Sequence, residues 1–119
     1  MKLAAIAFGL ALATAVTAAP IPAELGKAFG ATVVSTYPDG RTALLWLKRD
    51  GTYDAKGRRR TPSSGTWIVK SGKVCLKQLK PMRAPFSYCT PLPSGDTWKA
   101  KAVTGEPITV KIVAGVGVR

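Results

Sequence analysis

The sequence predicts an all-β fold: a small soluble antiparallel up-and-down barrel of about eight strands, with one short N-terminal helix and a signal-peptide helix before it. Three observations predict this fold. Short apolar or alternating runs recur at regular spacing from residue 31 onward, and hairpin-sized links of turn residues separate them. Alternation places the apolar side chains of paired runs on one face. A sheet with one apolar face hides that face and its edges by closing on itself.

The first residues have the pattern of a secretory signal peptide. Lys2 precedes an apolar run over residues 3–16, and small residues follow it. The run is shorter than the roughly 20 residues that span a bilayer, so we expect cleavage and no transmembrane span in the mature protein. We expect residues 1–18 to be removed and residues 19–119 to form a single β-barrel domain. The alanine-rich signal favours bacterial export, with the periplasm as the expected location.

One helix and eight strands are expected in the mature domain. The short helix covers residues 22–29, ends at Gly30 and can cover one mouth of the barrel. Each strand candidate ends at Gly, Pro, Asp, Ser or basic turn residues. The strand ranges are 32–37, 42–48, 52–55, 65–70, 73–79, 86–92, 97–103 and 108–113.

Two hairpins in the middle of the chain set a testable register. One has residues 71–72 at its tip, and the next is centred on Met82, which places Gln78 opposite Phe86. With this register, six apolar side chains share one face: Trp67, Val69, Val74, Leu76, Phe86 and Tyr88. In the last hairpin the apolar face contains Trp98, Ala100, Ala102, Ile108, Val110 and Ile112, while the lysines point away.

The same register places Cys75 directly opposite Cys89, on the face away from the apolar side chains. In an exported protein an even pair of cysteines indicates a disulfide. A bridge closing a loop of this size stabilises a fold by about 3 kcal/mol in the chain-entropy model. A free thiol or an intermolecular bridge is the alternative.

The chain is strongly basic, with 18 Lys and Arg residues against 6 Asp and Glu residues and a net charge of +12. Such a charge favours contact with anionic envelope polymers or lipids. Four candidate contacts with such anions fall in one loop: Lys56, Arg58, Arg59 and Arg60. Lys48 and Arg49 are nearby in the sequence. The alternative is that these charges only keep the protein in solution. Nucleic acid is not the expected partner, because an exported protein rarely meets it.

The residue inventory offers little to an enzyme. The chain has no histidine, and several of its six acidic residues fall in turns, as in Asp39-Gly40 and Asp50-Gly51. No nucleophile with a nearby base, no metal-ligand spacing and no phosphate-binding glycine loop is found. We therefore expect no catalytic residues, no metal and no cofactor.

Three short motifs carry a family resemblance. They are Asp50-Gly51-Thr52-Tyr53, Gly65-Thr66-Trp67 and Lys73-Val74-Cys75-Leu76. On these residues the chain resembles small exported bacterial proteins with lipocalin-like meander barrels. The resemblance extends over residues 31–113 in the rhythm of strands and turns. It implies the barrel fold more strongly than any activity.

Three non-catalytic functions follow from these features. The first is a binding or structural module of the cell envelope that holds a small apolar ligand or caps an envelope component. Its candidate interior residues either line a cavity or fill the barrel, and we expect filling because the domain is short. The second is a basic surface that binds anionic envelope polymers or lipids. The third is an enzyme inhibitor whose disulfide-braced loop, residues 80–85, presents Arg83 between prolines. The candidate interior residues are Trp46, Tyr53, Trp67, Phe86, Tyr88 and Trp98.

Overall fold

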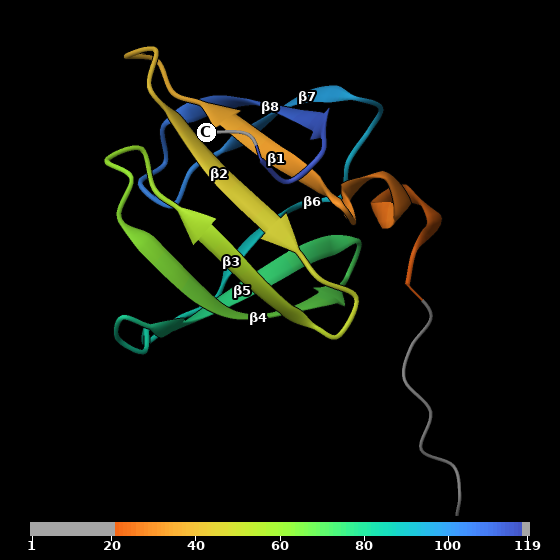
Figure 1. The fold of residues 1–119 in the computed structure, drawn as a ribbon, viewed down its shortest axis with the longest axis horizontal. Coiled ribbons are helices and arrows are strands. Elements are labelled where there is room, and N and C mark those ends of the chain that lie inside the picture. The colour runs from red at the N-terminus through yellow and green to blue at the C-terminus, as the bar shows by residue number, and fades with distance from the viewer. Residues whose placement is uncertain (1–20, 118–119) are drawn as a thin grey trace, which may run out of the picture.

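The protein is described by a computed structural model over residues 21–117, which form eight antiparallel strands in a nearly closed barrel (Figure 1). The predicted fold class is confirmed. The predicted signal peptide, residues 1–18, lies outside the described residues. Within residues 21–117 no helix has the length and apolar character needed to cross a membrane. The elements are the 3-10 helix η3 (Ala23–Ala28) and the strands β1 (Ala31–Thr36), β2 (Thr42–Leu47), β3 (Thr52–Lys56), β4 (Pro62–Lys70), β5 (Lys73–Lys80), β6 (Tyr88–Pro91), β7 (Thr97–Lys101) and β8 (Pro107–Ala114).

The barrel is open between β6 and β7 rather than between its first and last strands. The strands are hydrogen-bonded in the order β6-β5-β4-β3-β2-β1-β8-β7. The first strand, β1, therefore pairs with the last strand, β8. β6 has only four residues and ends at Pro91, which has no N–H to donate to a neighbouring strand. Across the opening, the Tyr88 hydroxyl donates a hydrogen bond to the Lys101 carbonyl.

The register predicted for the central hairpins is confirmed where both strands form. Trp67 lies opposite Leu76, and Cys75 lies opposite Cys89. The tip at residues 71–72 has both backbone φ angles positive, 52° and 74°, as a two-residue hairpin of the primed type requires.

The predicted pairing of Gln78 with Phe86 is wrong. β6 begins only at Tyr88, and Gln78 pairs with Gly65 of β4. Residues 81–87 form a loop because two of them are prolines, which interrupt a hydrogen-bonded ladder. Phe86 is therefore 53% exposed instead of lying on the buried face of a strand.

Two of the three resemblance motifs meet in space. Trp67 donates from its backbone N–H to the Gly51 carbonyl (2.9 Å) and from its indole Nε1 to the Lys48 carbonyl (2.8 Å). Gly65 lies at a β-bulge, where a Cβ atom would come within 1.9 Å of the Lys77 carbonyl oxygen. Only glycine allows β4 and β5 to approach this closely.

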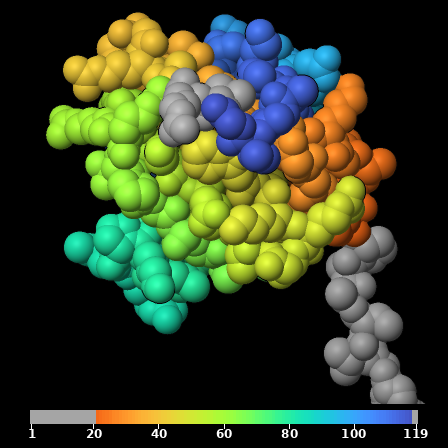
Figure 2. All heavy atoms as spheres, viewed as in Figure 1, coloured from red at the N-terminus to blue at the C-terminus, as the bar shows by residue number. Residues whose placement is uncertain are grey.

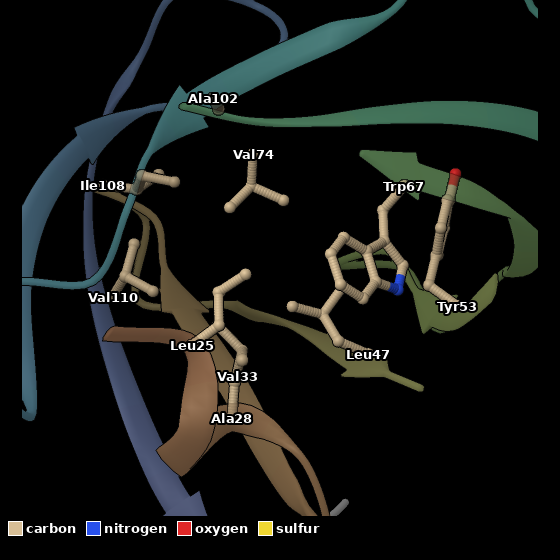
Figure 3. Close-up of a cluster of buried hydrophobic side chains, with 10 residues drawn as sticks. All are labelled: Leu25, Ala28, Val33, Leu47, Tyr53, Trp67, Val74, Ala102, Ile108 and Val110. Atoms are coloured by element: carbon tan, nitrogen blue, oxygen red, sulfur yellow. The ribbon is translucent and has the colours of Figure 1, made fainter. Parts of the chain in front are cut away.

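The helix η3 plugs one end of the barrel. Leu25 and Ala28 are 1% and 0% exposed and belong to the same buried cluster as the inward side chains of the strands. Figure 3 shows Leu25 pointing from the helix into this cluster, beside Val33, Val110 and Leu47. The expectation that the N-terminal helix covers one mouth is confirmed. We refer below to this end as the plugged end and to the opposite end as the open end.

The cysteines form the predicted disulfide, with Cα atoms 4.0 Å apart across β5 and β6. No free cysteine occurs in the described part of the chain. Because β6 is a short edge strand that pairs only with β5, the bridge ties this edge covalently to the sheet.

Candidate functional site

The interior of the barrel is hollow at its open end. A cavity of about 460 Å³ lies there, which we call the mouth cavity, and a smaller one of about 70 Å³ lies deeper, toward the plugged end. The expectation that side chains fill the whole interior is therefore wrong for this half of the barrel. The reason is the size of the inward residues, several of which are small. Small inward residues at the mouth cavity are Ser35, Ala43, Ala55 and Ser63.

The lining of the mouth cavity is mainly apolar and aromatic. Inward residues that border both cavities form the passage between them. Tyr53 is buried to 5% exposure at the wall, and burial raises the pKa of its hydroxyl, which stays neutral at physiological pH. Residues bordering both cavities are Ser35, Leu45, Leu76, Tyr88 and Ile108.

Arg58 joins three loops at the rim of the open end. Its guanidinium Nη2 donates to Glu106 Oε1 (2.8 Å), Nη1 lies 3.4 Å from Asp39 Oδ2, and the group stacks over the Tyr37 ring at 4.1 Å. We call these four residues the rim clamp. The Thr104 hydroxyl and Arg58 both lower the pKa of Glu106, so the carboxylate stays charged at neutral pH.

The loop of residues 81–87 forms one side of the mouth cavity. The backbone of Ala84 donates to the Gln78 carbonyl, and the Gln78 amide donates to the Met82 carbonyl, each at 3.0 Å. Lys77 Nζ also donates to the Ala84 carbonyl. Arg83 and Phe86 both border the cavity from this fixed loop. The loop predicted as an inhibitory tip is thus also a wall of the barrel mouth.

The six predicted interior aromatics do not share one environment. Tyr53 and Trp67 are in the buried core, and Tyr88 and Trp98 are partly buried on the inward face. Phe86 is exposed but borders the cavity. The Trp98 indole N–H is buried without a hydrogen-bond partner among the described residues.

Trp46 lies on the outside of the barrel, so its predicted interior position is wrong. Leu45 and Leu47 point inward from β2, and alternation turns Trp46 to the other face. Its indole Nε1 donates to the Thr32 hydroxyl (2.9 Å), which in turn donates to the Gly115 carbonyl (2.8 Å). The segment directly after β8 is therefore held against the outer face of β1 (Figure 1).

An outer groove of about 990 Å³ lies along the outer face of β2, and Val116 and Gly117 after β8 form part of its lining. In Figure 2 the yellow surface of β2 lies between the green β3–β4 loop and the dark-blue residues after β8. Leu44 on the groove floor is only 3% exposed although it points away from the barrel interior. The charged residues that line the groove are Lys48, Arg49, Asp54, Lys56 and Arg60.

The four predicted anion contacts separate in space. Lys56 and Arg60 line the outer groove, Arg58 is held in the rim clamp, and Arg59 is exposed. The structure adds Lys48 and Arg49 to the groove, from the turn that follows β2. The sequence signal for these two was only their proximity to the basic loop.

Among residues 21–117 no group of three or more His, Cys, Asp or Glu side chains could hold a metal ion. Comparison of the chain with protein-family models, curated proteins and solved structures gave no match. The lipocalin-like resemblance therefore stays a prediction, and the function has to be inferred from the geometry of the chain itself.

Proposed function

We propose that the protein is a non-catalytic binding module of the bacterial cell envelope that holds a small, largely apolar molecule in the mouth cavity. The observation that carries the proposal is the unfilled interior at the open end of the barrel. Its volume of about 460 Å³ falls in the usual range for small-molecule sites, roughly 300–1,000 Å³.

The lining supports a ligand that is mainly apolar and carries few hydrogen-bonding groups. Leucine, isoleucine and tyrosine side chains supply the contact area, and Ser35, Ser63 and Gln78 supply polar atoms at the wall. The hydrogen bonds within the loop of residues 81–87 and the rim clamp fix the opening in advance, which lowers the entropic cost of binding.

The proposed location is the periplasm. The signal-peptide pattern of the first 18 residues supports export. The Cys75–Cys89 disulfide supports it independently, because such bridges persist in oxidising compartments and are rare in the cytosol.

Titration with the uncharged fluorescent probe N-phenyl-1-naphthylamine tests the binding site. Ala55 borders the mouth cavity, so Ala55→Leu fills part of it, whereas Thr66→Leu adds the same kind of bulk at an exposed, outward position. We expect Ala55→Leu to weaken probe binding at least tenfold and Thr66→Leu to leave it within twofold. Equal affinities for both variants and the parent protein, with unchanged thermal unfolding, would contradict the proposal.

A further inference from the structure

The outer groove is a second site on the outward side of β2 and β3, and it does not depend on the function proposed above. It adjoins the mouth cavity, since Leu44 and Lys56 border both. One wall is the segment after β8, fixed by the hydrogen bond from Thr32 to Gly115. Thr32 itself is completely buried although it points to the outside of the barrel. The floor consists of outward side chains of β2, Leu44 and Trp46, and the Trp46 ring is held in place by its bond to Thr32. The floor is therefore apolar and preformed.

The opposite wall carries more positive than negative charge, with four basic residues and one acidic residue among the described lining residues. Asp54 is the one acidic residue among the described lining residues, and it pairs with Lys48 (2.8 Å). Arg60 donates to the carbonyl and hydroxyl of Thr42, at 2.6 and 3.0 Å, which orients the guanidinium without neutralising it. Within residues 21–117, Lys56 has no ion pair.

The charges follow the line of β2 rather than meeting at one point. Arg60 is bonded to Thr42, Lys56 is the register partner of Leu44, and Asp54, with Lys48 attached, is the partner of Trp46. These positions on β2 differ by two residues, which corresponds to steps of roughly 6–7 Å along a strand. At the end of the row Arg49 stacks over the Phe29 ring at 4.5 Å.

We propose that the outer groove binds a strand of an acidic polysaccharide. A row of spaced cations fits a chain whose carboxylates repeat along one side better than it fits a single anionic headgroup. A recessed floor does not admit the flat surface of a bilayer. The fixed indole of Trp46 offers a flat apolar surface to a sugar ring, and the Asp54 carboxylate accepts hydrogen bonds from hydroxyls, which a sugar supplies in number.

Binding of fluorescently labelled polygalacturonate oligomers tests this proposal, with the methyl-esterified oligomers as the uncharged counterpart. The test variant is the double substitution Lys56→Gln and Arg60→Gln, which removes two charges from the groove wall. The matched control is Lys99→Gln with Lys101→Gln. These two exposed lysines alternate along β7 and share the outward face, but they do not line the groove.

We expect the groove variant to bind the acidic oligomers at least tenfold more weakly and the control variant to change affinity less than twofold. The methyl-esterified oligomers should bind at least tenfold more weakly than the acidic form. Trp46→Ala should weaken binding of the acidic oligomers at least fivefold, and the salt dependence should become shallower in the double groove variant. Thermal unfolding of each variant shows whether it remains folded.

Three results would overturn the proposal. The first is an equal loss of affinity in the control variant, which would show that only net charge matters. The second is equal binding of the methyl-esterified oligomers. The third is tighter binding of a single-stranded oligodeoxynucleotide or of anionic phospholipid vesicles that is lost in the groove variant, which would assign the groove to another class of ligand.

Discussion

The two ends of the barrel are built from the same strands but are closed differently. At the plugged end, η3 inserts Leu25 and Ala28 among inward side chains and leaves a space of only about 70 Å³. At the open end no helix of residues 21–117 covers the strands, several inward residues are small, and the cavity measures about 460 Å³. The difference shows that the short helix and the sizes of the inward residues together decide which half of this barrel is packed and which half is hollow.

The ends also differ in what holds them together. Apolar packing fixes the plugged end, and the disulfide lies in the same half, where neighbouring Val74 and Thr90 border the small cavity. Hydrogen bonds and ion pairs of partly exposed side chains fix the open end, above all the rim clamp. We therefore expect substitutions at the plugged end to change stability most and those at the open end to change ligand binding most.

The largest effect is expected for Leu25→Ala. Leu25 is 1% exposed, so its truncation leaves a void in the packed cluster and should lower the free energy of unfolding by about 3–5 kcal/mol. Leu76→Ala at the mouth cavity should cost only about 2 kcal/mol, because this side chain already borders empty space. Urea unfolding measures both changes. Equal losses of unfolding free energy in the two variants would contradict the expectation that the plugged end contributes more to stability.

Removal of the disulfide comes next. The double substitution Cys75→Ser with Cys89→Ser should lower the free energy of unfolding by about 3 kcal/mol, since the closed loop restricts the unfolded chain. Binding of N-phenyl-1-naphthylamine to the folded variant should stay within twofold of the parent, because the bridge is on the outward face and neither cysteine lines the mouth cavity. A tenfold loss of probe affinity would show that the two halves are not independent.

A smaller effect is expected at the opening between β6 and β7. Tyr88→Phe removes the hydrogen bond to the Lys101 carbonyl and keeps the ring in place. The free energy of unfolding should fall by about 1 kcal/mol, the usual net value of one such bond. Amide hydrogen exchange should accelerate in β6 and β7 before it changes in β1 or β2. Uniform acceleration over all strands would contradict a local role for this bond.

The smallest effect is expected from the rim clamp and depends on pH. In the folded protein the pKa of Glu106 is lowered, mainly by the hydrogen bond from the Thr104 hydroxyl and next by Arg58. The charged carboxylate therefore stabilises the fold at pH values above the ordinary pKa of glutamate. That contribution is lost as the pH falls below the ordinary glutamate value of about 4.3 and through the lowered one. Glu106→Gln should unfold at a slightly lower temperature than the parent at neutral pH.

In acid the difference between Glu106→Gln and the parent should disappear, since the parent carboxyl is then protonated. Thermal unfolding followed from neutral to acidic pH measures this difference. Glu24→Gln is a suitable control, because Glu24 is exposed and outside the rim clamp. A constant difference at all pH values would show that Glu106 acts through packing and not through charge.

The sequence predicted the strands and the central register well because turn chemistry and alternation are local. The tip at residues 71–72 and the inward side chains of the last hairpin follow from positions a few residues apart, and the two cysteines are only 14 residues apart. The pairing of Gln78 with Phe86 failed for a local reason too: the prolines of the intervening loop prevent it.

Trp46 illustrates what alternation could not decide. The segment Ala43–Leu47 is apolar at every position, so neither face is marked as the inner one. Buried side chains in fact occur on both faces of β2, with Leu47 in the core and Leu44 at only 3% exposure on the outer face. The contact between Arg58 and Glu106, which are 48 residues apart, could not be predicted from the sequence either. An ion pair at that separation depends on which loops meet at the rim.

By itself the sequence determined the all-β class, the eight strands, the cysteine pair and the helix that covers one mouth, because each depends on turn residues, periodicity and spacing along the chain. The tertiary structure alone decided that the barrel closes between β1 and β8, that its open half is hollow, and that Lys48, Arg49, Lys56 and Arg60 share one groove. These features depend on how side chains from distant segments pack together and on which charges they bring close, and a local sequence pattern contains neither.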